Sequence, residues 1–237
     1  MQSSTEQQNT PKKTGLLANI LINVAIPAII LSRFSGEDAL GPVWGLIVAL
    51  SFPIGFGLWE LKRAGKVNFF SVLGVISVML TGGIALLQLD AKYIAIKEAA
   101  IPGAIGLAVL ISQFTRYPLV TKFILNGDLL DNGKLYAALA ERDNRALFER
   151  KLATAGYMVA SSFFLSSVLN YLLAKLILVS PPGTTAFNEE LGKMTWLSYP
   201  VIVLPCMVIL FFAIWFIFSS ISKLTGRELE SFMQQTE

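Results

Sequence analysis

Polar side chains recur at four-residue intervals within three otherwise apolar stretches of the chain. The first stretch carries Asn19 and Asn23, the third Ser77 and Thr81, and the fifth Ser162, Ser166 and Asn170. In a helix this spacing places the members of each set on one face. Because an unpaired amide or hydroxyl is costly in apolar surroundings, these groups should face other helices or water. The pattern predicts either hydrogen bonds between helices or a hydrated site for a polar ligand.

Three charged residues lie at the end of, or within, the apolar stretches. Glu60 and Arg63 close the second stretch, and Arg116 lies inside the fourth, in the half expected to face the cytoplasm. A guanidinium at that depth costs free energy unless it reaches the headgroups or finds a partner. Three interpretations of Arg116 follow: a snorkelling side chain, a partner for Glu60, or part of a site for an anion or lipid headgroup.

Small residues follow one another every four positions along the second stretch. This ladder allows another helix backbone to approach closely and so predicts helix packing. Its members are Gly41, Gly45, Ala49 and Gly57, with Pro53 in step with them. The alternative is a mobile helix, weakened at Pro53, that opens a pathway. Ser35, in the preceding connection, is expected to carry no packing constraint.

The residue types present leave little room for catalysis. The chain has no His and a single Cys, Cys206, so it cannot assemble a Ser-His-Asp triad or a His/Cys zinc site. Its sequence contains no Gly-rich phosphate loop followed by Lys-Ser/Thr, and no carboxylate cluster within an apolar stretch. These observations predict a non-enzymatic protein without a metal or cofactor.

The elements that position these residues are membrane helices. Of 237 residues, 54% are hydrophobic and 15% are charged, against about 25% charged in soluble domains; the mean hydropathy is +0.62. A water-soluble enzyme is therefore excluded. The sequence predicts an all-α polytopic membrane protein with six transmembrane helices and a cytoplasmic amphipathic connection. The apolar runs are 16–32, 40–61, 68–89, 100–125, 152–179 and 195–222.

The distribution of basic residues predicts the orientation. With six spans, 14 of the 19 Lys and Arg residues lie on one side and five on the other. Basic residues concentrate on the cytoplasmic side of membranes, so both termini should be cytoplasmic, in a bacterial inner membrane. The formal net charge of +3 is explained in this way without nucleic-acid binding. Membrane lipids are the expected partners.

Five segments follow from these boundaries: a cytoplasmic tail at 1–15, a four-helix membrane segment at 16–125, the connection at 126–151, a two-helix membrane segment at 152–225, and a cytoplasmic tail at 226–237. Within the connection, Asn132 opens a helical stretch that places Leu135 and Leu139 on one face. Its balanced charges argue against a polybasic lipid switch. We expect an amphipathic helix on the inner membrane surface, or a surface on which a partner docks.

Charged residues also gather on the opposite side of the membrane, before Pro102. They are Asp90, Lys92, Lys97 and Glu98. A solvated loop at the entrance to the fourth span is the expected structure, and a binding site at a periplasmic mouth is the alternative.

Dispersed features between about residues 16 and 125 carry a resemblance to a known family. They are Asn23 with Pro27, the basic run 62–66, Gly82-Gly83 followed by Leu86, the turn from Asp90 to Lys97, and Ser112 followed by Pro118-Leu119. In these the chain resembles the intracellular septation protein A (YciB-like) family of inner-membrane proteins. It departs from that family because Lys97 and Pro102 are separated rather than adjacent, and because the 126–151 connection and the last two spans are longer.

The resemblance implies a multi-span bacterial inner-membrane protein connected to cell division, envelope synthesis or envelope integrity. We therefore expect a non-enzymatic scaffold associated with the envelope or with division. Envelope or division proteins and a second copy of the chain are its candidate partners. The alternative is a small-solute or lipid transporter with a polar site between the first, third and fifth helices.

Overall fold

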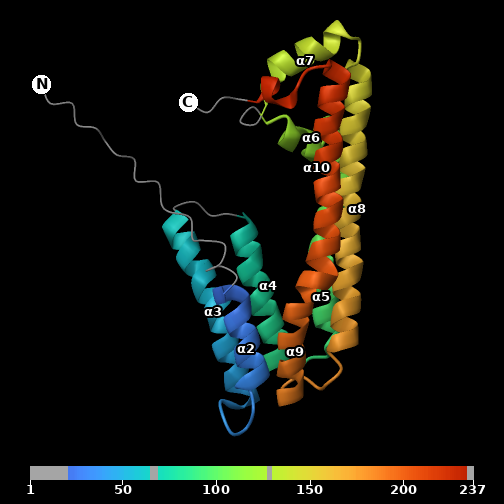
Figure 1. Cartoon of the computed structure of the whole chain (residues 1–237). Coiled ribbons are helices and arrows are strands. Elements are labelled where there is room, and N and C mark those ends of the chain that lie inside the picture. Colours follow the sequence, from blue (N-terminus) through green and yellow to red (C-terminus); the bar gives the residue numbers. More distant parts are fainter. Residues whose placement is uncertain (1–20, 65–68, 127–129, 234–237) are drawn as a thin grey trace, which may run out of the picture. The chain divides into compact units, whose positions relative to one another are not determined.

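The computed structural model describes residues 21–64, 69–126 and 130–233, and this part of the chain is helical (Figure 1). Its only β pairing is an isolated antiparallel bridge between Leu130 and Met233. In chain order the elements are the π-helical turn η1 (Leu21–Ala25), α2 (Ile26–Arg33), α3 (Gly41–Ala64), α4 (Phe69–Leu86), α5 (Lys92–Ser112), α6 (Leu119–Ile124), α7 (Asn132–Glu141), α8 (Arg145–Ile177), α9 (Thr185–Ser198), the π-helical turn η2 (Tyr199–Val203), α10 (Leu204–Thr225) and the 3-10 turn η3 (Leu229–Phe232).

Four helical segments among the described residues are long and apolar enough to cross a membrane: Gly41–Trp59, Lys92–Ser112, Arg145–Ile177 and Thr185–Thr225. Two further apolar helices, Leu21–Arg33 and Val72–Leu86, are shorter. The prediction of an all-helical membrane protein is therefore confirmed in its coarse form. Six full spans are not, because only four helices reach the required length.

The fourth apolar run does not form one continuous helix. It was expected over 100–125, but α5 begins at Lys92 and ends at Ser112, and the short α6 follows after a bend. Pro118 precedes α6 with an extended ψ of 125°, because proline disfavours the helical conformation in the residue before it and has no N–H to continue the ladder. Apolar composition alone did not reveal this break.

The chain divides into two compact units that alternate along the sequence: Met1–Ile94 with Ala174–Leu197, and Ala95–Leu173 with Ser198–Glu237. In the first unit, α3 packs against both α2 and α4. Gly192 of α9 lies against α2, where an added Cβ would be 3.0 Å from the carbonyl oxygen of Ala28. A small residue at this position is what allows the two helices to approach.

In the second unit, α8 and α10 run side by side (Figure 1). The Ser167 hydroxyl of α8 donates to the carbonyl of Ala99 on α5 at 2.7 Å. With 33 residues, α8 is about 50 Å long, whereas a bilayer core is about 30 Å thick. One end of α8 must therefore project from the hydrocarbon. The N-terminal turns, Arg145–Lys151, carry the charges.

The predicted helix in the 126–151 connection exists, as α7, but its apolar face does not lie on a membrane. Leu135 and Leu139 are fully buried against Phe148 and Leu152 of α8 and Ile221 of α10. The expectation of a surface-lying amphipathic helix is thus wrong for these two residues, and they are not an open docking face either. The chain itself covers them, because α8 and α10 extend far enough to offer an apolar surface.

Candidate functional site

The polar stripe on α8 is bonded to backbone carbonyls. Ser162 is buried and donates to the carbonyl of Cys206 on α10 at 3.1 Å, and the Cys206 thiol lies 3.5 Å from the carbonyl of Ser162. One turn further on, the Asn170 amide donates to the carbonyl of Ser166 at 2.8 Å and to its hydroxyl at 3.2 Å. The stripe therefore joins α8 to α10 at Ser162 and bonds within α8 at Asn170.

The remaining stripe residues belong to the first unit. The buried Thr81 hydroxyl donates to the Ser77 carbonyl one turn earlier on α4, at 3.1 Å. Asn23 lies half-buried in η1, and Asn19 falls outside the described residues. The predicted site between the first, third and fifth helices thus draws on residues of both units, and the bonds of each stripe are described within its own unit.

The small-residue ladder of α3 meets several different neighbours. A Cβ on Gly57 would come within 2.6 Å of a methyl of Val75 on α4, whereas one on Gly45 would press on Ser35 in the connection before α3. Ala49 is fully buried. Gly41 has a positive φ of 72° and open space around it, so its role is the turn that starts α3.

The charged residues expected at the cytoplasmic level are placed only in part. The side chains of Glu60 and Arg63 lie outside the described residues. Arg116 is exposed in the bend between α5 and α6, so its expected position inside a span is wrong. The helix ends at Ser112, before the arginine, and this removes the cost that made a buried partner necessary.

At the other end of α5, helix replaces most of the expected loop. Asp90 precedes the helix and accepts the Lys92 N–H at 2.8 Å and its ammonium at 3.3 Å. The Lys92 backbone hydrogen bond, and then its side chain, lower the pKa of Asp90. Lys97 and Glu98 lie within α5 and form an ion pair of 2.7 Å, with only 10% of the Lys97 side chain exposed. The solvated-loop interpretation is wrong for these two residues.

A buried polar network in the first unit was not anticipated from the sequence. The Asn188 amide on α9 donates to the Ser35 hydroxyl at 3.1 Å and to the Pro42 carbonyl at 2.7 Å. The Thr185 hydroxyl donates to the Ser35 carbonyl at 3.1 Å. Ser35 and Asn188 are each 1% exposed. The expectation that Ser35 is unconstrained is therefore wrong, because a distant segment encloses it.

The most fully packed part of the second unit joins α7 to the C-terminal segment. We call it the α7 cluster. Its ten buried members are Leu130, Leu135, Ala138, Leu139, Phe148, Leu152, Ala155, Ile217, Ile221 and Phe232. Phe232 is 1% exposed, and its carbonyl accepts the N–H of Asp131 at 2.8 Å. The C-terminal segment is thus held by an aromatic side chain and by backbone pairing, neither of which has a local sequence signal.

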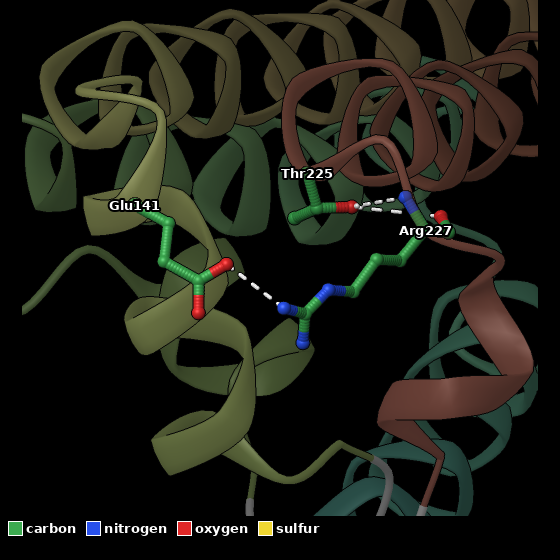
Figure 2. A network of polar contacts seen from close by, with 3 residues as sticks. All are labelled: Glu141, Thr225 and Arg227. Carbon is green, nitrogen blue, oxygen red and sulfur yellow. Dashed lines mark hydrogen bonds and ion pairs between the residues drawn. The ribbon is translucent and has the colours of Figure 1, made fainter.

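Polar contacts surround the α7 cluster. Arg227 reaches Glu141 at the end of α7 with a 2.8 Å ion pair, and its N–H donates to the Thr225 hydroxyl at 3.3 Å (Figure 2). The Asn144 amide donates to the Leu224 carbonyl at 2.9 Å. Gly226 ends α10 with a positive φ of 65°, as is common after the last helical residue.

The start of α7 is stabilised electrostatically. The Asp131 carboxylate accepts the Lys134 N–H at 3.1 Å and lies 3.2 Å from its ammonium. The backbone hydrogen bond, and then the ammonium, lower the pKa of Asp131. This arrangement is an N-cap, which satisfies one of the N–H groups that a helix start leaves without a partner.

These observations define a class of protein: an all-helical chain with four helices of membrane-spanning length and composition. Within the described ranges no group of three His, Cys, Asp or Glu residues is placed to hold a metal ion. Comparisons with family models, with curated proteins and with solved structures give no match. The function must therefore be argued from the contacts themselves.

Proposed function

We propose that the protein is a bacterial inner-membrane scaffold of the cell envelope or division machinery that acts by binding rather than catalysis. The observation that carries this proposal is the bonding of polar side chains between membrane helices. A scaffold needs such groups paired with protein, whereas a transporter needs them around water. Ser162 on α8 bonds to α10, and Ser167 bonds to α5, each through a backbone carbonyl.

A second feature favours a binding role. The α7 cluster gives the second unit a packed end whose outer surface carries exposed charges, among them Glu141, Arg142, Asp143, Arg145 and Arg150. Rims of protein interfaces are polar and charged in this way. On this proposal a partner from the envelope or division machinery would contact α7 and the first turns of α8.

Thiol accessibility tests the first step of this proposal. Cys206 is replaced by Ser, and single cysteines are placed at Ser77, Ser162 and Asn170, with Lys134→Cys as an exposed control. An impermeant thiol reagent is then applied to intact cells and to inverted vesicles. We expect labelling of residue 134 from one side and protection of the other three. Labelling of residues 162 and 170 would favour a hydrated pathway and hence the transporter.

The cellular role needs a separate experiment. Depletion of the protein from its bacterium should lengthen the cells or sensitise the envelope to detergent, and the wild-type gene should restore both. Normal cell length together with normal detergent resistance would contradict a scaffold role in division or the envelope. A scaffold also predicts unchanged solute uptake in the depleted cells.

Lipid handling is the second candidate, and one observation favours it. An open groove of about 390 Å³ in the first unit is lined by Ile22, Ser51, Phe52, Gly55, Phe56 and Trp59. It lies along α3, where Pro53 removes one backbone hydrogen bond and so weakens the helix. Exchange of fluorescent lipid between vesicles, present with the reconstituted protein and lost with Gly55→Trp, would support this candidate over the scaffold.

A further inference from the structure

The segment 114–125, between the end of α5 and the start of the α7 cluster, exposes large apolar side chains in an unusual concentration. Phe114 is 77% exposed and Phe123 is 74% exposed, with Tyr117 and Leu119 at least half exposed. Isolated apolar residues on a surface are ordinary, but a group of this size marks a contact with protein or membrane.

The same segment carries positive charge without acidic residues. Arg116 and Lys122 are both exposed, and no Asp or Glu occurs between residues 113 and 125. The Lys122 ammonium lies 4.2 Å from the ring centroid of Tyr117, within the range of a cation–π interaction. Exposed cations beside exposed aromatic rings are typical of the level where lipid headgroups meet acyl chains.

The segment is held in place by bonds to α5. The Ser112 hydroxyl accepts the Leu119 N–H at 3.1 Å, and the Thr115 hydroxyl donates to the Ser112 carbonyl at 2.8 Å. At its other end, Ile124 and Leu125 pack against the α7 cluster. Because α5 is long and apolar enough to span a membrane, the residues that follow it directly must lie near the membrane surface.

We propose that residues 114–125 form a binding surface for anionic phospholipids. The aromatic rings enter the boundary between headgroups and acyl chains, and Arg116 and Lys122 bind the lipid phosphates. The absence of acidic residues favours an anionic headgroup over a zwitterionic one. This inference rests on the membrane location within the proposed function, and not on the scaffold role.

Lipid titration of the purified full chain tests the charges. The protein in an uncharged detergent is titrated with phosphatidylglycerol or phosphatidylcholine, and its thermal unfolding midpoint is followed. Each cation near an anionic surface contributes about fivefold, so Arg116→Gln with Lys122→Gln should weaken the apparent affinity for phosphatidylglycerol about thirtyfold. Lys134→Gln with Arg150→Gln, which removes two exposed charges elsewhere in the unit, should leave it nearly unchanged.

Equal affinities in the two double variants would overturn the proposal, as would equal effects of the two lipids on the wild type. Both double variants must unfold at the wild-type temperature without lipid, which excludes a general loss of folding as the cause. Added salt should reduce the phosphatidylglycerol effect in the wild type.

A second measurement locates the aromatic side chains. Phe123→Cys in a Cys206→Ser chain is labelled with a fluorophore and reconstituted into phosphatidylglycerol vesicles. We expect quenching by brominated acyl chains and little quenching by iodide in the water. Quenching by iodide, or by neither, would contradict the proposal, because the surface would then face water or be covered by protein. Thiol protection at residues 162 and 170 is measured independently, so failure of either proposal can be distinguished.

Discussion

Single residues carry most of the specific information in this structure, and the Ser35–Asn188 pair illustrates how. Both side chains are polar, both are buried, and their hydrogen bond joins the connection before α3 to α9. Asn188 also satisfies the Pro42 carbonyl at the start of α3. A buried polar group that loses its partner costs more than the bond contributes.

Asn188→Ala should therefore lower the stability of the first unit by about 1–3 kcal/mol, since the Pro42 carbonyl and the Ser35 hydroxyl lose their donor. The measurement is the free energy of unfolding of the full chain in detergent. Glu189→Ala, at the exposed neighbouring position, is the matched control and should change little. A loss no larger than that of the control would argue against the network.

Asp131 makes stability depend on pH in a definite direction. Its pKa in the folded state is lowered, so the folded chain binds this proton more weakly than the unfolded chain. The contribution is present above the ordinary Asp pKa of about 3.9 and is lost as the pH falls through the lower folded value. Asp131→Asn, which keeps an acceptor at the N-cap, should reduce the fall in unfolding temperature between about pH 5 and pH 3.

The control for this titration is Asp143→Asn, which removes another exposed carboxylate close to α7. Its pH profile should follow that of the wild type more closely than the Asp131→Asn profile does. If both variants gave the same profile as the wild type, the capping contact would have no part in the acid sensitivity.

At the scale of elements, the α7 cluster depends on a residue far from it in the sequence. Phe232 lies at the end of η3, yet it packs with α7 and with both long helices of the unit. Backbone pairing of Leu130 with Met233 and the Glu141–Arg227 ion pair add to this contact. The ion pair is exposed, and exposed pairs contribute little, so the aromatic side chain is the main anchor.

Phe232→Ala should cost about 3–5 kcal/mol within the cluster, as truncation of a buried aromatic side chain does elsewhere. Hydrogen exchange of the full chain in nanodiscs should then show faster exchange in α7, while α3 and α4 remain unchanged. The neighbouring Met233 is exposed, and Met233→Ala serves as the control. Unaltered exchange in α7 would mean that its position does not depend on the C-terminal segment.

At the scale of the whole molecule, apolar surface on the helices requires a membrane. Residues such as Phe211, Phe212 and Trp215 of α10 are exposed, and in water such a surface would favour aggregation. Lipid contact explains these residues without any further partner. The orientation in that membrane remains a prediction from the distribution of basic residues.

Cysteine labelling tests the orientation of the whole chain. In a Cys206→Ser chain, a cysteine at Ala140 should react with an impermeant reagent only after permeabilisation, whereas one at Glu37 should react in intact cells. Both positions are exposed in the structure, so accessibility to the reagent reports the side of the membrane. Reaction of residue 140 in intact cells would invert the proposed topology.

The sequence by itself determined the helical class, the apolar segments and the start of α7. These are local properties, because the length of an apolar run and the residues at a helix start act within a few positions. The N-cap at Asp131 shows this, since it needs only the N–H of Lys134. The resemblance to a septation family and the function derived from it remain predictions.

Only the tertiary structure decided which of these residues are buried and what they meet. Ser35 is enclosed by Asn188, 153 positions later, and Gly45 is required small because that serine lies against it. The cluster around Phe232 and the exposure of Arg116 were equally inaccessible to pattern. The physical reason is that burial depends on neighbours from distant parts of the chain, whereas periodicity reports only the face on which a residue lies.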